Sequence, residues 1–269
     1  MTDSPVRPQT LVLAFLGDRL LGRDLRVATG SLLDVLARVG VTEHAARSAL
    51  TRMTAQGLLD RERRGKQVYL GLTPRSREIL DDGERRIWRD GVVNDEPDAA
   101  WTLLGFTIPE SHRAQRHLLR SRLLWAGFGL LQGGLWISPA DVDVPALLDG
   151  IDSAGQIRAF RARTLDPTDV ADLVAGAWDL DALAGGYRRF TERWSAAPGP
   201  RDDALARQLL LTAGWLTLIR QDPRLPARYL PADWPAAGAQ ELFRRLHAEL
   251  DPRAERLARE VLDVAGPAS

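Results

Sequence analysis

The sequence contains no cysteine and no long hydrophobic run, and these two absences exclude several classes of protein. Without cysteine the chain has no disulfide framework, no zinc-thiolate site and no thiol nucleophile. No segment approaches the ~18 consecutive apolar residues that suggest a membrane-spanning helix. The first ten residues also lack the basic and apolar regions of a secretory signal peptide. We therefore expect a soluble protein of the reducing cytoplasm with no membrane partner.

Lysine is scarce as well, with Lys66 as the single example, and the formal net charge of the chain is zero. The charge is nevertheless unevenly distributed. Residues 41–77 contain eight arginine or lysine residues but only three acidic ones. Such a basic stretch is the electrostatic pattern expected of a surface that contacts phosphates. At 269 residues the chain is long enough for two or three domains, so a basic surface on one domain is compatible with a neutral whole.

A helix-turn-helix pattern underlies the first part of this basic stretch. Apolar residues at helical spacing predict helices over about residues 8–21 and 29–39. After Gly40, Thr42 is suited to cap a third helix that ends at Gly57. One side of this third helix carries side chains that all form hydrogen bonds: His44, Arg47, Ser48, Thr51 and Arg52. In a major groove they would contact base edges and phosphates, although an isolated helix with such a face is more often simply solvated.

A basic β-hairpin is predicted next, because residues 58–73 form two strand-like runs around a turn at Gly65 and Lys66. Arg63, Arg64 and Lys66 at its tip are placed to reach phosphates or a minor groove. The alternative is an exposed hairpin whose charges serve only solubility. Together with a further helix that ends near residue 89, the order of elements predicts a winged helix-turn-helix DNA-binding domain over residues 1–91.

A second domain is predicted over residues 97–165, after an acidic, proline-containing linker at 94–98. Strands and helices alternate here in the order βαββαβ, which is that of a ferredoxin-like module, a fold that often pairs with itself. The strands are expected at 101–106, 127–131, 135–138 and 157–163, and the helices at 109–125 and 144–151. We expect this module to dimerise the protein.

The remaining residues, 166–269, predict a helical C-terminal domain, so the whole fold is expected to be α+β and mostly helical. A proline-rich loop at 222–235 interrupts the helices and contains tyrosine and tryptophan. Such a loop either lines a ligand pocket or covers the helical core.

Enzyme chemistry is not supported by the residue pattern. The four histidines do not share one helical face, and the carboxylates are not clustered as a metal-dependent nuclease would need. Neither a nucleophile elbow nor a phosphate-binding loop motif is present. We therefore expect no catalytic residues, no metal and no cofactor.

Three parts of the sequence resemble the PaaX-type family, the repressors of phenylacetate catabolism. They are residues 41–53 with 57–59 and 64–73, residues 122–139, and residues 222–226 with 230–235. The resemblance implies a homodimeric repressor of an aromatic-acid catabolic operon. It would bind double-stranded operator DNA and be released by an aryl-coenzyme A such as phenylacetyl-coenzyme A.

Such an effector needs cationic groups for its phosphates and an apolar slot for its acyl end. The residues that could supply these are Arg220, Arg224, Arg228, Tyr229 and Trp234. The same residues could equally serve packing and the surface. The alternative function is a DNA-binding scaffold or regulator with no small-molecule effector, controlled by its abundance or by a protein partner.

Overall fold

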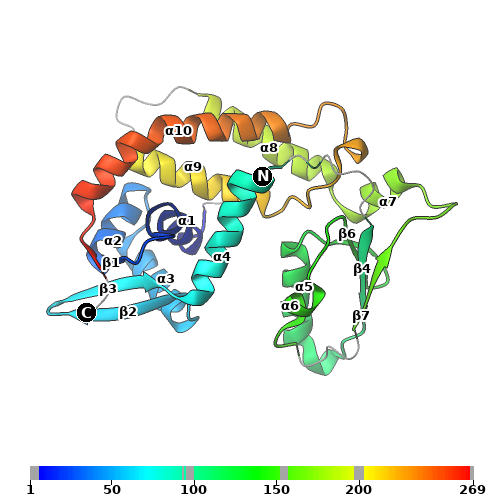
Figure 1. The fold of residues 1–269 in the computed structure, drawn as a ribbon, viewed down its shortest axis with the longest axis horizontal. Coiled ribbons are helices and arrows are strands. Elements are labelled where there is room, and N and C mark those ends of the chain that lie inside the picture. Colours follow the sequence, from blue (N-terminus) through cyan, green and yellow to red (C-terminus); the bar gives the residue numbers. More distant parts are fainter. Residues whose placement is uncertain (1–5, 93, 95–99, 152–156, 197–202, 267–269) are drawn as a thin grey trace. The chain divides into compact units, whose positions relative to one another are not determined.

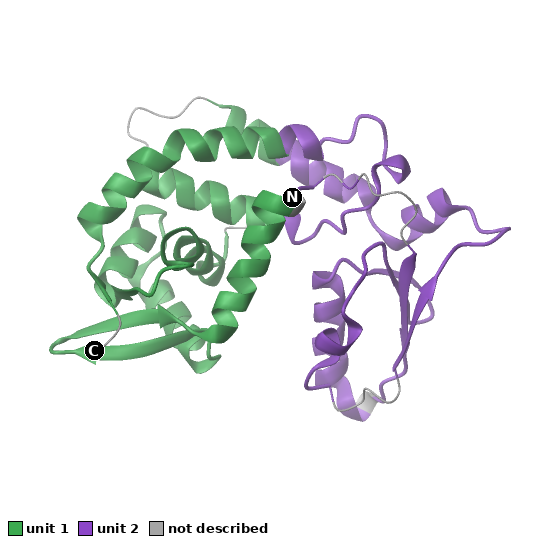
Figure 2. Ribbon diagram, in the orientation of Figure 1, with its two compact units in different colours: residues 1–90, 190–217, 240–269 green, residues 91–189, 218–239 purple. Residues whose placement is uncertain are grey.

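The computed structural model describes residues 6–92, 94, 100–151, 157–196 and 203–266 (Figure 1). It is a mixed α+β fold that is mostly helical, as predicted, and its described strands form two antiparallel four-stranded sheets. The chain divides into two compact units (Figure 2). Unit 1 comprises residues 1–90, 190–217 and 240–269, and unit 2 comprises residues 91–189 and 218–239. No described helix is both long and apolar enough to span a membrane.

Apart from the short strand β1, the N-terminal part of unit 1 contains helices and strands in the predicted order. They are α1 (Pro8–Leu20), β1 (Arg26–Ala28), α2 (Thr29–Arg38), α3 (Glu43–Ala55), β2 (Leu59–Arg64), β3 (Gln67–Leu72), α4 (Pro74–Glu84) and a π-helical turn η1 (Arg85–Asp90). Helix α3 begins where expected, because the Thr42 hydroxyl accepts a hydrogen bond from the Ala45 amide. The tight turn between β2 and β3 contains Gly65, whose positive φ of 60° suits glycine.

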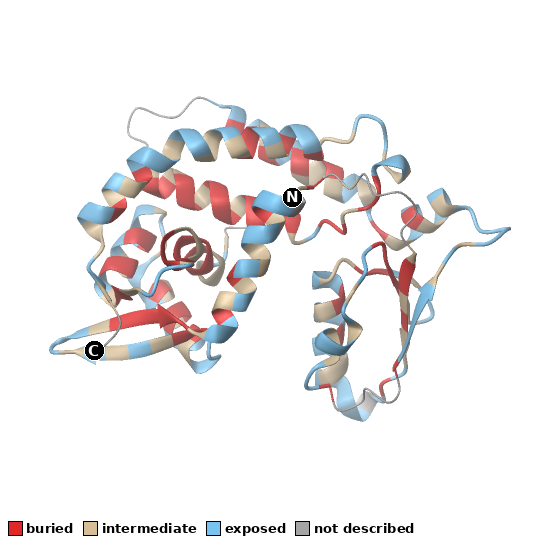
Figure 3. Cartoon of the chain, in the orientation of Figure 1, coloured by how far each residue is buried: buried red, intermediate tan, exposed pale blue. Residues whose placement is uncertain are grey.

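The C-terminal helices are divided between the two units. The chain continues with α7 (Val170–Ala177), α8 (Leu180–Ser195), α9 (Ala204–Ile219), α10 (Ala236–Val261) and β8 (Val264–Ala265). Helix α7 and the first part of α8 belong to unit 2, and most of α9 and α10 complete unit 1. The parts of α8, α9 and α10 that belong to unit 1 bury Trp215 and Phe243, whose rings stack 4.9 Å apart. Helix α1 is buried along most of its length (Figure 3). The core of unit 1 is therefore built from both ends of the sequence.

A fourth strand joins the hairpin sheet from the far end of the chain. The strand order is β2-β3-β1-β8, and β8 pairs antiparallel with β1 through Val27 and Val264. Neither β1 nor β8 is predictable from the sequence, because three and two residues are too few to show the alternation of a strand. The C-terminal strand is thus a structural part of the N-terminal sheet.

Unit 2 contains the predicted ferredoxin-like order of elements. These are β4 (Trp101–Phe106), the 3₁₀ turn η2 (Glu110–His112), α5 (Arg113–Trp125), β5 (Gly129–Gln132), β6 (Leu135–Ser138), α6 (Val144–Leu148) and β7 (Ile157–Ala162). The sheet order is β5-β6-β4-β7, with every neighbouring pair antiparallel. Leu104, Leu119, Leu123 and Phe128 form the centre of its core.

Two details of unit 2 differ from the prediction. The helix expected from residue 109 begins with the turn η2, and α6 is shorter than expected because it ends at Leu148. A short 3₁₀ helix, η4 (Ala227–Tyr229), lies in the proline-rich loop. This loop passes very close to Gly127, where an added Cβ would lie 3.2 Å from the Cα of Pro223. Most of the predicted linker at 94–98 lies outside the described residues.

Candidate nucleic-acid interface

Helix α3 presents one apolar and one polar side. Ala46, Ala49, Leu50 and Met53 are buried, and α3 contacts both α1 and α2. On the other side lie the predicted site residues. Ser48 is partly exposed, and the other four are exposed: His44, Arg47, Thr51 and Arg52. The structure therefore brings all five predicted α3 residues onto one accessible surface.

Arg47 is held by an ion pair on its own helix. Its Nε lies 2.8 Å and its Nη2 2.7 Å from Oε1 of Glu43, one turn earlier. Both side chains are more than half exposed. An exposed i,i+4 pair of this kind contributes only about 0.3 to 0.5 kcal/mol. Arg47 can therefore exchange Glu43 for a guanine edge or a phosphate at little cost.

The tip of the β2–β3 hairpin is cationic. Arg63 and Lys66 are exposed, and Nε of Arg63 donates to the carbonyl of Gly65 at 3.2 Å. Arg61 is also exposed and lies two residues before Arg63, so the alternation of the strand places both on the same face. Arg61 belongs to the same candidate surface, although it was not among the predicted site residues. Arginine at alternate positions of the predicted strand, 61 and 63, is the sequence signal that could have identified Arg61.

Arg64 lies differently from its predicted companions at the tip. Its Nε donates to Oε1 of Glu62 at 2.5 Å, and its Nη2 donates to the carbonyl oxygen of Gly266 at 2.6 Å. Its guanidinium carbon is also 5.7 Å from the centre of the Tyr69 ring. Arg64 is therefore tied to the C-terminal strand segment, whereas Arg63 and Lys66 project from the turn.

The acidic residues of the hairpin are neutralised by an arginine from β1. Nη1 and Nη2 of Arg26 donate to the two carboxylate oxygens of Asp60 at 2.6 and 2.8 Å, and Nε of Arg26 lies 2.8 Å from Glu62. The hydrogen bond from Arg64 and the nearby charge of Arg26 lower the pKa of Glu62. Gly71 leaves room for the ion pair between Arg26 and Asp60, because a Cβ at this position would lie 2.7 Å from the Asp60 carboxylate. The cationic tip thus keeps its positive potential.

The predicted effector residues lie in unit 2 and contact different partners. Arg224 has a positive φ of 56°, and its amide donates to Oδ1 of Asp222 at 2.7 Å. The Tyr187 hydroxyl donates to the other oxygen of Asp222 in a buried bond. Trp234 packs against Tyr187 with their rings 6.4 Å apart. Burial raises the pKa of both Asp222 and Tyr187, so the cluster around Asp222 is a site of strongly perturbed ionisation.

The other three predicted residues, Arg220, Arg228 and Tyr229, take part in contacts with aromatic rings. The guanidinium of Arg220 is 4.4 Å from the Trp125 ring, and that of Arg228 is 4.7 Å from the Tyr229 ring. Tyr229 in turn lies 6.0 Å from Trp101. The contacts therefore divide the five predicted residues into three sets: Arg224 with Trp234, Arg220 alone, and Arg228 with Tyr229. Asp222 and Tyr187 were not predicted, because a lone acid before a proline and a tyrosine at helical spacing carry no distinctive sequence signal.

These features define a class of α+β protein in which three N-terminal helices and a basic hairpin are followed by a ferredoxin-like sheet and C-terminal helices. Three family models match successive parts of the chain. They are "PaaX-like protein" at residues 7–76, "PaaX protein central Cas2-like domain" at 94–174 and "PaaX-like protein C-terminal domain" at 178–260. The chain belongs to the PaaX family, which confirms the resemblance seen in the sequence.

Two individual proteins are similar along most of their length. The chain is 27% identical to the "Transcriptional repressor PaaX" of Escherichia coli (strain K12) over 267 residues, covering 93% of this chain and 82% of that protein. Its fold is similar to that of "Uncharacterized protein Rv0674 from Mycobacterium tuberculosis", with a TM-score of 0.60 and 25% sequence identity. That match covers 93% of this chain and 98% of the other.

Proposed function

We propose that this protein is a transcriptional repressor that binds double-stranded operator DNA. The observation that carries the proposal is the accessible polar face of α3 next to a hairpin with an exposed cationic tip. The similarity to a transcriptional repressor along nearly the whole chain supports it. Family membership also agrees with the expectation that the protein is not an enzyme. Such a repressor would act in the bacterial cytoplasm, where the operator lies.

The two parts of the surface would have different tasks. In a winged helix-turn-helix, α3 would enter the major groove, where Arg47 and Arg52 would read guanine while Ser48 and Thr51 contact bases or phosphates. Arg63 and Lys66 would contact phosphates beside the groove and add affinity that does not depend on sequence. His44, in the first turn of α3, lies on the same exposed face and would contact bases or phosphates.

We assign dimerisation to the central domain at 97–165 and DNA binding to residues 1–91. A homodimer would present two α3 helices to half-sites about 34 Å apart, or at a multiple of that spacing. This assignment is supported by the ferredoxin-like sheet, whose edge strand β7 is exposed along most of its length. A palindromic operator is the expected consequence of such a pair.

The finer proposal is that an aryl-coenzyme A, such as phenylacetyl-coenzyme A, binds the C-terminal part at 166–269 and releases the DNA. Arg224 and Trp234 beside the perturbed Asp222 support an effector site there. The second candidate is a regulator with no small-molecule effector. It is favoured by the contacts of Arg220 and Arg228, whose guanidinium groups already lie on aromatic rings.

An electrophoretic mobility shift with the DNA upstream of the protein's own gene tests both the binding of operator DNA and its release by an effector. We expect a specific shift that phenylacetyl-coenzyme A or a related thioester abolishes. A specific shift that no thioester changes would support the second candidate. The absence of a specific shift on this DNA and on promoters of aromatic-acid catabolism would contradict the repressor itself.

A further inference from the structure

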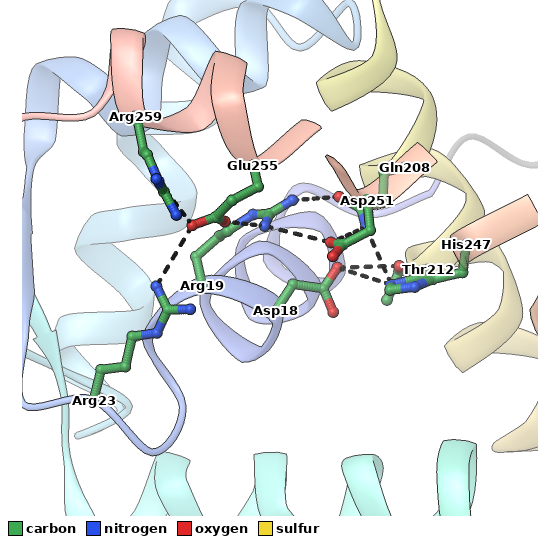
Figure 4. A network of polar contacts seen from close by, with 9 residues as sticks. All are labelled: Asp18, Arg19, Arg23, Gln208, Thr212, His247, Asp251, Glu255 and Arg259. Carbon is green, nitrogen blue, oxygen red and sulfur yellow. Dashed lines mark hydrogen bonds and ion pairs between the residues drawn. The ribbon is translucent and has the colours of Figure 1, made fainter. Parts of the chain in front are cut away.

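A polar network joins α1 to α9 and α10 inside unit 1 (Figure 4). Arg19 at its centre is only 6% exposed, and its Nη1 donates to Glu255 at 2.5 Å while Nη2 donates to Gln208. Beside it, Thr212 donates to Asp18 at 3.1 Å. The network thus connects the first helix of the DNA-binding part to the C-terminal helices by charged groups.

A cavity of about 420 Å³ lies next to this network. It is lined by Arg19, Leu20, Arg23, Leu25, Glu255, Ala258, Arg259, Leu262 and Val264. Its walls come from the end of α1, the segment before β1, the end of α10 and β8. The volume falls in the range of sites that bind small molecules. Its wall is half aliphatic and half charged, so it suits a ligand with both an apolar and an ionised part.

The charged groups of the cavity carry an excess of cations. Three guanidinium groups surround the one carboxylate of Glu255: those of Arg19 at 2.5 Å, Arg259 at 3.3 Å and Arg23 at 3.9 Å. Asp251 adds a second carboxylate, 3.7 Å from Arg19. Arg23 and Arg259 are more than half exposed, so they are able to turn toward an incoming anion (Figure 4).

Arg19 forms the inner wall of the cavity, and both of its terminal nitrogens are already engaged by Glu255 and Gln208. Arg23 and Arg259 are the two exposed cations of the cavity, so they are the groups placed to meet an anion from solvent.

We propose that this cavity binds a small organic acid. The ligand carboxylate accepts hydrogen bonds from Arg23 and Arg259, in the paired geometry that guanidinium and carboxylate groups share. The apolar body of the acid lies against Leu20, Leu25 and Leu262. A neutral ligand of the same shape would leave the cations without a new partner. This site is separate in the sequence from the predicted effector residues at 220–234.

The cavity wall is connected to the hairpin sheet by the residues that follow α10. Between Leu262 and Val264, the carbonyl of Asp263 accepts from the Ala28 amide at 2.8 Å, and its carboxylate accepts from the Tyr69 hydroxyl at 3.0 Å. A ligand that displaces Glu255 from Arg23 and Arg259 would favour a different position of this segment. The consequence for DNA rests on the proposed function, because it requires that the hairpin contacts DNA.

Isothermal titration calorimetry of the full chain without DNA tests the site. The probes are benzoate, its neutral isostere benzamide, and inorganic phosphate. We expect benzoate to bind one to one and benzamide not to bind. Arg23→Ala and Arg259→Ala should each weaken benzoate binding by about tenfold. The matched control is Arg245→Ala, because Arg245 pairs with Glu249 on α10 as Arg259 pairs with Glu255, but it does not line the cavity.

Four results would overturn the proposal. The first three are no heat with benzoate at millimolar concentration, equal weakening by Arg245→Ala, and binding of phosphate as tight as that of benzoate, which would indicate a simple anion site. Ala258→Leu keeps all the cations but fills the cavity, so unchanged benzoate binding to this variant would also contradict it. Since no DNA is present, the result does not depend on whether the protein is a repressor.

Discussion

Two arginine residues of unit 1, Arg47 and Arg19, show how burial determines whether a guanidinium group is available to a ligand or stabilises the fold. Arg47 on α3 is 59% exposed, and its partner Glu43 lies on the same helix. Arg19 on α1 is 6% exposed, and its partners Gln208 and Glu255 come from α9 and α10. The exposed pair is weak and can be exchanged for a ligand, whereas the buried contacts hold distant parts of the chain together.

This contrast separates stability from DNA binding. Substitutions in the buried network should unfold the protein or loosen it, with DNA binding lost only as a consequence. Substitutions on the exposed face should leave the free energy of unfolding almost unchanged and alter DNA binding directly.

The largest effect is expected for Arg19→Met. Removing this guanidinium takes two charge-assisted hydrogen bonds away, one from the buried Gln208 and one from Glu255, which keeps only the exposed Arg23 and Arg259, so the free energy of unfolding should fall by about 3 to 5 kcal/mol. Urea denaturation measures this. Arg23→Ala, at an exposed position of the same network, is the control and should cost less than about 1 kcal/mol. Similar losses for the two variants would remove the distinction between buried and exposed arginines.

The next effect depends on pH and concerns Asp18. Burial raises the pKa of Asp18 to about 7, although Arg19 and Thr212 act in the opposite direction. The folded state therefore holds a proton that the unfolded state releases. The stabilisation from this proton is complete below the unfolded pKa of about 3.8 and is lost as pH rises through about 7.

Asp18→Asn removes the Asp18 contribution while the neighbouring His247 and Asp251 stay in place. The stability of the wild type relative to Asp18→Asn should fall by about 1.4 kcal/mol per pH unit between the two pKa values. His247, whose pKa burial lowers, is present in both proteins, and because its Nε2 lies 4.0 Å from Asp18 the difference also contains the interaction between the two groups. A difference that does not change with pH would mean that Asp18 is ionised in the folded protein.

Operator selectivity should respond to substitutions on α3 by a smaller amount. If Arg47 and Arg52 read guanines, Arg47→Ala and Arg52→Ala should each cost about 1 to 3 kcal/mol of discrimination between the operator and a mismatched duplex. Competition binding with the two duplexes measures this, and thermal unfolding checks that stability is unchanged. An unaltered preference would exclude the residue concerned from base reading.

The smallest effect is expected at the hairpin tip. Lys66→Ala should weaken binding to all duplexes similarly and reduce the slope of log affinity against log salt by about one. Arg64→Ala is an instructive comparison, because Arg64 is bonded to Gly266 and should change the slope less. A larger change for Arg64 than for Lys66 would show that the C-terminal segment releases it when DNA binds.

The sequence predicts the local parts of this molecule well. The Thr42 cap, the hairpin around Gly65 and the polar face of α3 all depend on residues a few positions apart, and the structure contains each of them. The βαββαβ order is also local, since each element has its own period.

The parts that could not be predicted depend on pairs far apart in the chain. Arg19 and Glu255 are separated by 236 residues, and nothing in either neighbourhood indicates the other. The same holds for β8 beside β1 and for Tyr187 beside Asp222. A single sequence shows which residues are amphipathic, but it does not show which surfaces meet. Chemical type alone suggests the effector residues, and the structure gives them three sets of partners.

Selection of bound duplexes from a random DNA library tests the central claim most directly. The account predicts an inverted repeat with half-sites about one helical turn, roughly 34 Å, apart or at a multiple of it. It also predicts that the Arg47→Ala, Arg52→Ala double variant, which should fold normally, selects no defined sequence. Recovery of the same motif with the double variant would contradict the assignment of α3 as the reading helix. Failure of the wild type to enrich any sequence would contradict the repressor function.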